Sequence, residues 1–169
     1  LKYGPWTDMS LYRNTEAYKQ DQLIYHSAPL LEDLLIAGQI KLNAFIGMNV
    51  KDTDFEYLMY EVRLDGTEIF LTTDILRARY RTSLENEKLV IPGRIYKYDC
   101  QTSYFTVRKL KKGSRLRFIF RALNNPFWQK NFNSGGKVVD ETAEDAEIAV
   151  IKLYHDNEHP SYIEIPIVK

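Results

Sequence analysis

The sequence predicts an all-β protein, folded as a β-sandwich or jelly roll. Apolar and polar residues alternate with a period of two in several stretches, the pattern of strands with one buried face. Turn residues interrupt these stretches every ~8–12 residues, as in sandwiches and jelly rolls. No segment keeps a 3.6-residue period over three turns. The 12 Tyr and 8 Phe also favour strands.

The chain begins with a stretch that has no clear period. Residues 1–22 scatter Trp6, Tyr12 and Tyr18 among charged residues. They are either a linker from an upstream domain or an aromatic arm that lies over a domain interface. The jelly-roll domain is expected to follow over residues 23–169, and its first strands are predicted at 23–27, 34–38 and 40–50.

Residues 55–71 predict a hairpin. Alternation resumes from Phe55 to Leu64 and places Leu58, Tyr60 and Val62 on one face. Asp65-Gly66 is a hairpin signal, and the chain returns as a strand at residues 69–71.

An arginine run follows. Arg77-Ala78-Arg79-Tyr80-Arg81 alternates as a strand would, which would place its three Arg side chains on one face. Such a face is either a phosphate site or, as a neutral protein favours, an ion-paired sheet surface or interdomain patch.

The second half predicts further strands and one helical turn. The turns Pro92-Gly93 and Lys111-Lys112-Gly113 separate the first of these strands. Residues 142–147 allow a helical turn. The strands are predicted at residues 95–100, 105–107, 116–122, 146–153 and 162–168.

The longest irregular stretch, residues 124–136, mixes turn chemistry with large aromatic side chains. Asn, Ser, Gly and Pro126 favour turns. Phe127, Trp128 and Phe132 lie among them, more apolar area than a solvated loop usually presents. This loop is therefore expected to pack on the sandwich, on a ligand or on another domain.

Composition limits the classes of function. Lys+Arg and Asp+Glu both number 23, which argues against a nucleic-acid partner. No apolar run is long enough to span a membrane. The start, Leu1-Lys2-Tyr3, carries neither Met nor a signal-like segment, so we expect a piece of a longer protein. Cys100 stands alone, which leaves open a cytoplasmic or an exported bacterial protein.

No catalytic constellation is evident in the sequence. None of the serines lies in a G-x-S-x-G elbow. Cys100 falls within a predicted strand among Tyr residues, where a buried, inert thiol is expected. We therefore assign no catalytic residue and no cofactor.

Two further patterns suggest metal ligands, but both favour a simpler interpretation. His155 and His159 have a metal-like spacing, yet they lie in a connection without an evident third ligand, so imidazoles hydrogen-bonded in a turn are expected. Asp52-Thr53-Asp54 lacks the pattern of a calcium loop, and capping or salt-bridging carboxylates are expected. We assign no metal site.

A set of short motifs, each weak alone, resembles one family when taken in order. The chain resembles the C-terminal domain of X-Pro dipeptidyl-peptidases and cocaine-esterase-like hydrolases, a family that includes glutaryl-7-ACA acylases and α-amino-acid ester hydrolases. The resemblance runs from about Tyr25 to Lys169. The motifs are Tyr25-x-Ser27-x-Pro29-Leu30, Asp52-Thr53-Asp54-Phe55, Leu76 to Arg81, Lys112 to Arg117, Asn131-x-Asn133-Ser134-Gly135-Gly136 and His155-x3-His159-Pro160-Ser161.

The resemblance implies a jelly-roll sandwich of galactose-binding-like type, placed after an α/β-hydrolase domain that holds the Ser–Asp–His triad. The sandwich itself is not catalytic; it packs on the hydrolase and helps to shape the substrate cleft or the oligomer interface. Lys130 stands where the family has Arg, so bidentate pairing is lost there. Candidate interface or signature residues are Asp54, Arg77, Arg79, Tyr80, Phe127, Trp128, Asn131, Asn133, Gly135, Gly136, His155 and His159.

Two other functions remain open. Sandwiches of this shape often bind sugars, and Trp128 or Phe127 could stack on a pyranose, so a carbohydrate-binding module is the main alternative. An independent enzyme is the third, although it lacks a constellation of catalytic residues.

Overall fold

The structure is a computed structural model that describes residues 21–123 and 128–168. The predicted lead-in, residues 1–22, lies outside these ranges up to residue 20, and β1 already begins at Gln22. In the described part, no helix is long and apolar enough to cross a bilayer. The elements are β1 (Gln22–His26), β2 (Leu34–Gly38), β3 (Lys41–Met48), β4 (Asp54–Val62), β5 (Glu68–Arg77), β6 (Ile95–Gln101), β7 (Thr106–Leu110), β8 (Arg115–Ala122), β9 (Ile151–Tyr154), β10 (Tyr162–Glu164), β11 (Ile167–Val168) and the 3₁₀ turns η1 (Ala78–Tyr80) and η2 (Ala143–Asp145).

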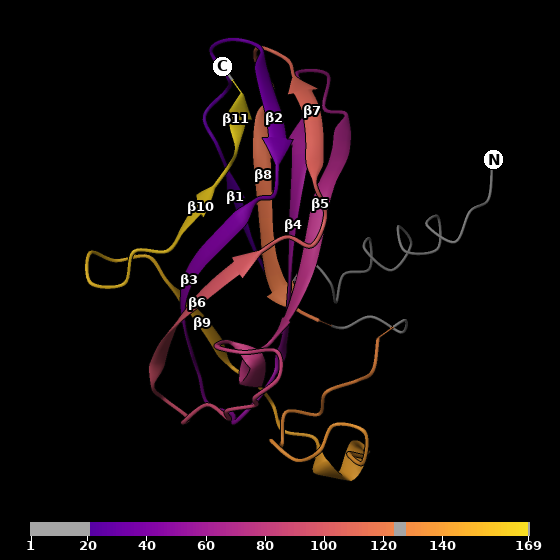
Figure 1. Ribbon diagram of the computed structural model, residues 1–169, viewed down its shortest axis with the longest axis vertical. Coiled ribbons are helices and arrows are strands. Elements are labelled where there is room, and N and C mark those ends of the chain that lie inside the picture. The colour runs from indigo at the N-terminus through magenta and orange to yellow at the C-terminus, as the bar shows by residue number, and fades with distance from the viewer. Residues whose placement is uncertain (1–20, 124–127, 169) are drawn as a thin grey trace, which may run out of the picture.

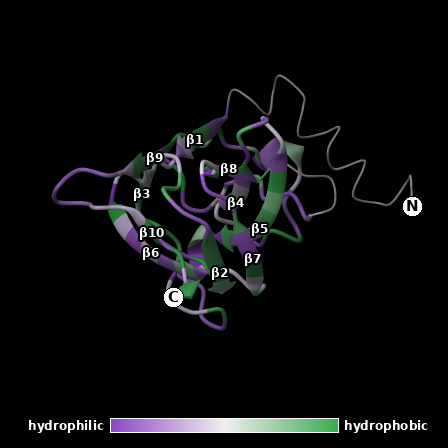
Figure 2. Ribbon diagram, turned by 90° about the horizontal axis from the view of Figure 1, so that it is seen from above, coloured by the Kyte–Doolittle hydropathy of each residue, from purple (hydrophilic) through white to green (hydrophobic). Residues whose placement is uncertain are grey.

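These strands form two layers of antiparallel sheet (Figures 1 and 2). One layer has the order β1-β8-β4-β5. The other contains β10-β3-β6, with β9 also paired to β3, and continues into the smaller sheet β11-β2-β7. The all-β sandwich predicted from the sequence is confirmed. Its jelly-roll, galactose-binding-like character stays a prediction.

The core lies between the layers and follows the predicted alternation. Leu116, Phe118 and Phe120 of β8 are buried, and Arg117 and Ile119, which alternate with them, lie on the other face of the strand. The ring of Phe55 in β4 contacts those of Phe120 and Tyr98, with centroids 5.4 and 5.8 Å apart. Aromatic and aliphatic side chains from both layers thus fill the sandwich.

Alternation alone left open which face of β4 is buried. The core side is the odd-numbered one, with Phe55, Tyr57 and Met59 in the central cluster. Leu58 on the opposite face is also buried, and the register to β5 shifts between Met59 and Tyr60. A bulge of this kind increases local twist.

The prediction that the arginine run forms one strand face is wrong. β5 ends at Arg77, and Ala78–Tyr80 form the turn η1. The Asp52 carboxylate accepts a hydrogen bond from the backbone N–H of Arg79 (2.8 Å), and the N–H of Ala78 donates to the carbonyl of Thr53 (2.9 Å). These bonds turn the chain inward, so consecutive arginines no longer share a face.

The last segments are shorter than predicted. The helical turn is confirmed as η2, which Thr142 caps. The strand predicted over residues 146–153 is reduced to β9, and the one over 162–168 is divided into β10 and β11. Pro166 lies in that break and has no N–H to donate to a ladder.

Candidate functional site

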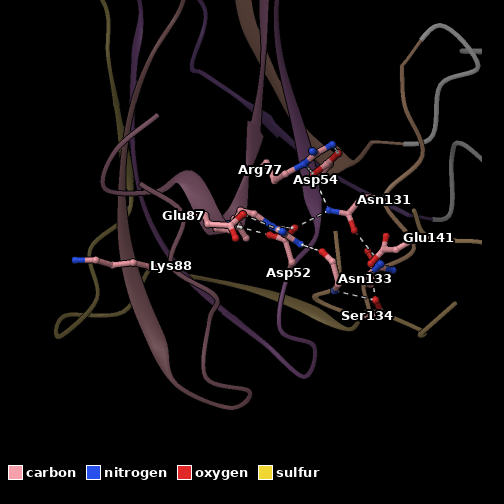
Figure 3. A network of polar contacts seen from close by, with 12 residues as sticks. Asp52, Asp54, Arg77, Glu87, Lys88, Asn131, Asn133, Ser134 and Glu141 are labelled. Atoms are coloured by element: carbon pink, nitrogen blue, oxygen red, sulfur yellow. Dashed lines mark hydrogen bonds and ion pairs between the residues drawn. The ribbon is translucent and has the colours of Figure 1, made fainter. Parts of the chain in front are cut away.

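A buried network of charges joins the start of β4 and the end of β5 to the loop after β8 (Figure 3). Asp52 and Asp54 flank Thr53 where the chain enters β4, and both are buried. The side chain of Arg79 is buried as well. Buried charges are stable only when paired and hydrogen-bonded, so the network must be closed on itself.

The two carboxylates each hold one arginine. Arg77 donates from Nε and Nη2 to the two oxygens of Asp54, at 2.8 and 2.9 Å, a bidentate pair. Arg79 donates from Nε to Asp52 at 2.7 Å and from Nη1 to Glu87 at 3.1 Å. The expectation that these aspartates form salt bridges is confirmed.

The pKa values of both arginines are raised, which keeps them charged. The side-chain hydrogen bond with Asp54 raises the pKa of Arg77. Burial alone would lower the pKa of Arg79, but the hydrogen bond and the charge of Asp52 outweigh burial. Neither group is therefore a source of protons for catalysis.

Asn131 connects the loop to both aspartates. Its amide nitrogen donates to Asp52 at 2.9 Å and to Asp54 at 3.0 Å, and its amide oxygen accepts from the backbone N–H of Asn133 at 2.9 Å. One buried amide thus fixes the loop to the sheet and also sets the next turn.

The turn that follows depends on Asn133 and two glycines. Asn133 has φ 71° and donates from its side chain to the carbonyl of Glu147 at 2.8 Å. Gly135 has φ 82°, and a Cβ there would lie 2.7 Å from Cβ of Lys51. The carbonyl of Gly136 accepts from Nη2 of Arg79 at 2.7 Å. The motif is thus a folded turn locked onto an arginine.

The structure therefore brings together seven of the candidate residues: Asp54, Arg77, Arg79, Asn131, Asn133, Gly135 and Gly136. Tyr80 is half-buried in η1 beside them. Trp128 is 56% exposed at the start of the described loop, and Phe127 lies outside the described residues. Trp128 thus does not fill the end of the sandwich.

The two histidines belong to another part of the molecule, the connection between β9 and β10. Nδ1 of His159 lies 3.2 Å from Asp156, and its ring packs on Phe45 and Tyr154. His155 packs edge-on against Tyr25 of β1. Across residues 21–123 and 128–168, no three His, Cys, Asp or Glu side chains gather as they would around a metal ion.

Sequence reasoning missed three acidic members of the loop region. Glu87 pairs with Arg79, Glu141 accepts hydrogen bonds from Ser134 and from the N–H of Phe132, and the backbone of Glu147 holds both Phe132 and Asn133. Glu141 and Glu147 lie close to the motif in sequence, but no periodicity marks them.

Another buried carboxylate, Glu61, lies on β4 away from the loop. It is fully buried and accepts from Nε of Arg108 (2.8 Å) and from the hydroxyl of Ser114 (3.0 Å). Burial acts to raise the pKa of Glu61, but these hydrogen bonds outweigh it and the pKa is lowered. Cys100 stays inert, because burial raises the pKa of its thiol to about 12.

An open depression of about 510 Å³ adjoins the network. Asp54 and Asn131 form part of its wall, together with Leu23 of β1, Lys130 of the loop and Ile148 of the segment before β9. Its described lining contains no serine, cysteine or histidine. The arrangement can hold a loop rigidly and present a surface.

Comparison with known proteins points to one group of hydrolases. The model of the X-Pro dipeptidyl-peptidase C-terminal non-catalytic domain matches residues 6–164. The cocaine esterase of Rhodococcus sp. (strain MB1 Bresler) is 31% identical over 151 residues, which cover 89% of this chain and 26% of that protein.

Solved structures share the fold. An aminopeptidase from the marine sediment archaeon Thaumarchaeota archaeon superposes with a TM-score of 0.85 at 23% identity, over 93% of this chain and 27% of that one. An α-amino acid ester hydrolase gives a TM-score of 0.81 at 22% identity, over 88% of this chain and 26% of that one. The chain thus spans about a quarter of the length of these relatives.

Proposed function

Because the chain belongs to the X-Pro dipeptidyl-peptidase C-terminal non-catalytic domain family, we propose that it packs on an upstream α/β-hydrolase domain of the same polypeptide and helps to shape that domain's substrate cleft. In this proposal the longer polypeptide cleaves an ester or amide through an acyl-enzyme intermediate. The sandwich helps to position and enclose the substrate in the cleft. Residues 23–169 are the sandwich domain, and residues 1–22 are the lead-in from the hydrolase.

One observation carries the proposal: a buried, self-satisfied charge network holds a loop that presents a half-exposed tryptophan. Asn131 and Arg79 fix the loop by hydrogen bonds to buried carboxylates, while Trp128 points outward at 56% exposure. A rigid loop with an outward aromatic anchor is what a domain interface needs, because the anchor loses little entropy on docking.

The same surface could serve an oligomer of the parent instead of its cleft. Both arrangements use the loop as a contact surface, and size-exclusion chromatography of the longer polypeptide separates them. If Trp128→Ala lowers turnover in an unchanged oligomer, the cleft is supported. If Trp128→Ala dissociates the oligomer, a role of the loop in the oligomer interface is supported.

The first test is hydrolysis by the chain alone. In the presence of the purified 169-residue chain, p-nitrophenyl esters and X-Pro anilides are expected to hydrolyse only at the background rate. The polypeptide extended through its upstream sequence is expected to hydrolyse one of these two substrate classes. Turnover by the short chain that survives replacement of every serine would overturn the assignment.

A carbohydrate-binding module is a second candidate, favoured by the exposed Trp128 alone. An exposed indole can stack on a sugar ring. Binding of the isolated chain to a glycan array, removed by Trp128→Ala, would support that function; an array without signal would exclude it for the glycans tested.

A further inference from the structure

The sandwich is open at one edge, where β1 faces the segment that leads into β9. In the antiparallel pairing of β1 with β8, Leu23 lies opposite Phe120 and Tyr25 opposite Phe118. Directly paired residues point to the same side of a sheet, and both phenylalanines belong to the core. Leu23 and Tyr25 therefore point between the layers, yet they remain 41% and 37% exposed.

The opposite wall of this edge is apolar as well. Ala149 and Ile151 pack against the core, while Ile148 is 87% exposed and lines the depression. Inward-facing side chains of a closed sandwich lie out of solvent. Their exposure here means that the described residues leave this edge uncovered.

We infer that residues 6–20 of this chain cover the open edge, with their aromatic side chains packed on Leu23 and Ile148. The segment ends at Asp21, which itself lines the depression, so it is tethered at the surface it would cover. It contains Trp6, Met9, Leu11, Tyr12 and Tyr18, enough apolar area to need burial.

Reach and family membership both favour this occupant. Packed layers lie about 10 Å apart, whereas residues 6–20 span up to about 50 Å when extended, so the segment can contact both walls. The family match begins at residue 6 rather than at β1, so the family model extends over this segment as well as the sandwich. A tether this short gives a high effective concentration at the edge.

The aromatic lead-in is thus an intramolecular cover of the sandwich, a role different from the linker and from the arm over a domain interface that its sequence suggested. Polar residues at the rim agree with this. Lys130 is exposed and lines the depression together with Asp21, and residues 6–20 offer the carboxylates of Asp8 and Glu16.

Trp6 provides a direct readout. The chain has 2 Trp, so Trp128→Phe leaves Trp6 as the sole indole. In this background the emission of Trp6 is expected to be blue-shifted, and its acrylamide quenching about threefold weaker, relative to a free peptide of residues 1–20. Quenching equal to that of the free peptide would overturn the inference.

A matched pair of substitutions locates the contact. Ile148→Ser, at the depression, should shift Trp6 emission to the red and raise its quenching toward the peptide value. Leu84→Ser, at a site of similar exposure (85%) outside the depression, should leave both unchanged. Equal effects of the two, or no effect of Ile148→Ser, contradict the proposed site.

Hydrogen exchange tests the edge without any tryptophan. Removal of residues 1–20 should speed exchange about fivefold in residues 21–26 and 147–151 and leave β6 unchanged. Unchanged exchange at the edge would show that residues 1–20 do not cover it. The inference would then fail while the proposed function stands. If the truncated chain does not fold, the two point variants still decide.

Discussion

Asn131 is the residue through which the loop after β8 reaches the sandwich. Its amide bridges two buried carboxylates that each already hold an arginine, so it also separates two negative charges. Sequence identified Asn131 through the family motif, but not its role. Its partners Asp52 and Asp54 come more than 70 residues earlier in the chain, a distance that local patterns do not bridge.

Replacement of Asn131 should therefore destabilise the fold. We expect Asn131→Ala to lower the free energy of unfolding by about 2–4 kcal/mol, since a hydrogen bond to a charged group contributes about 1.5–3 kcal/mol. Urea denaturation measures the change. The control Asn157→Ala, in an exposed turn, should stay within about 0.5 kcal/mol. Similar losses in both variants would contradict the bridging role.

Glu61 makes stability depend on pH. Its pKa is lowered in the folded protein from an ordinary value of 4.5. A carboxyl group with a lowered folded pKa adds stability that is complete above its unfolded pKa and is lost as pH falls toward the folded one. The free energy of unfolding should therefore decline as pH decreases below about 4.5.

Glu61→Gln should remove that part of the decline. Urea denaturation between neutral and acid pH should give a flatter curve for Glu61→Gln than for the native chain, together with a lower stability at neutral pH. Glu85→Gln, at an exposed site, should keep the native slope. A native slope in Glu61→Gln would show that other carboxylates cause the decline.

At the scale of elements, buried carboxylates decide where β5 ends. Alternation continues through Arg81, so the sequence predicts that the strand continues as well. In the structure, the backbone N–H and the side chain of Arg79 both donate hydrogen bonds to Asp52, and the chain turns at Ala78. Hydrogen bonds to a charged, buried acceptor outweigh the local preference for extension.

The turn at Gly135 should tolerate a side chain less well than another glycine turn. Gly66 and Gly135 share φ 82°, but a Cβ at Gly66 meets nothing within 4 Å, whereas one at Gly135 lies 2.7 Å from Lys51. Gly66→Ala is expected to cost about 1–2 kcal/mol, the penalty of a left-handed conformation. Gly135→Ala should cost about 1–3 kcal/mol more, because of the clash.

Thermal and urea unfolding of the two variants measure this difference directly. The pair controls for backbone conformation, so the excess loss reports the close approach of the loop to Lys51. Equal losses would mean that the loop relaxes away from the sheet without cost.

At the scale of the whole molecule, the sandwich is complete in its core but open at its periphery. The loop with Trp128 and the edge beside Leu23 both present apolar surface in the described chain. The stretch of the cocaine esterase that matches this chain makes up 26% of that protein. Exposed anchors are expected where a domain normally meets the rest of its polypeptide.

Trp128→Ala should separate stability from activity in the longer polypeptide. The isolated chain should unfold within about 0.5 kcal/mol of the native value, since Trp128 is largely exposed. In the polypeptide with its upstream sequence, kcat/KM should fall about 10–100-fold, as expected when a distant contact misplaces the cleft.

Tyr104→Ala is the matched control, because Tyr104 is an exposed aromatic in the turn between β6 and β7. It should change neither stability nor kcat/KM. An unaltered kcat/KM in Trp128→Ala would show that the loop does not help to shape the cleft.

By itself the sequence determined the all-β class, the central strands and the candidate loop, because strand period, turn residues and short motifs are local properties of a chain. It also identified Asn131, Gly135, Arg77 and Arg79 as candidate residues. Only the tertiary structure decided that Arg79 turns inward to Asp52, which face of β4 is buried and that the edge at β1 is open. These features depend on residues far apart in the chain, whose meeting is fixed by burial and charge pairing and not by local pattern.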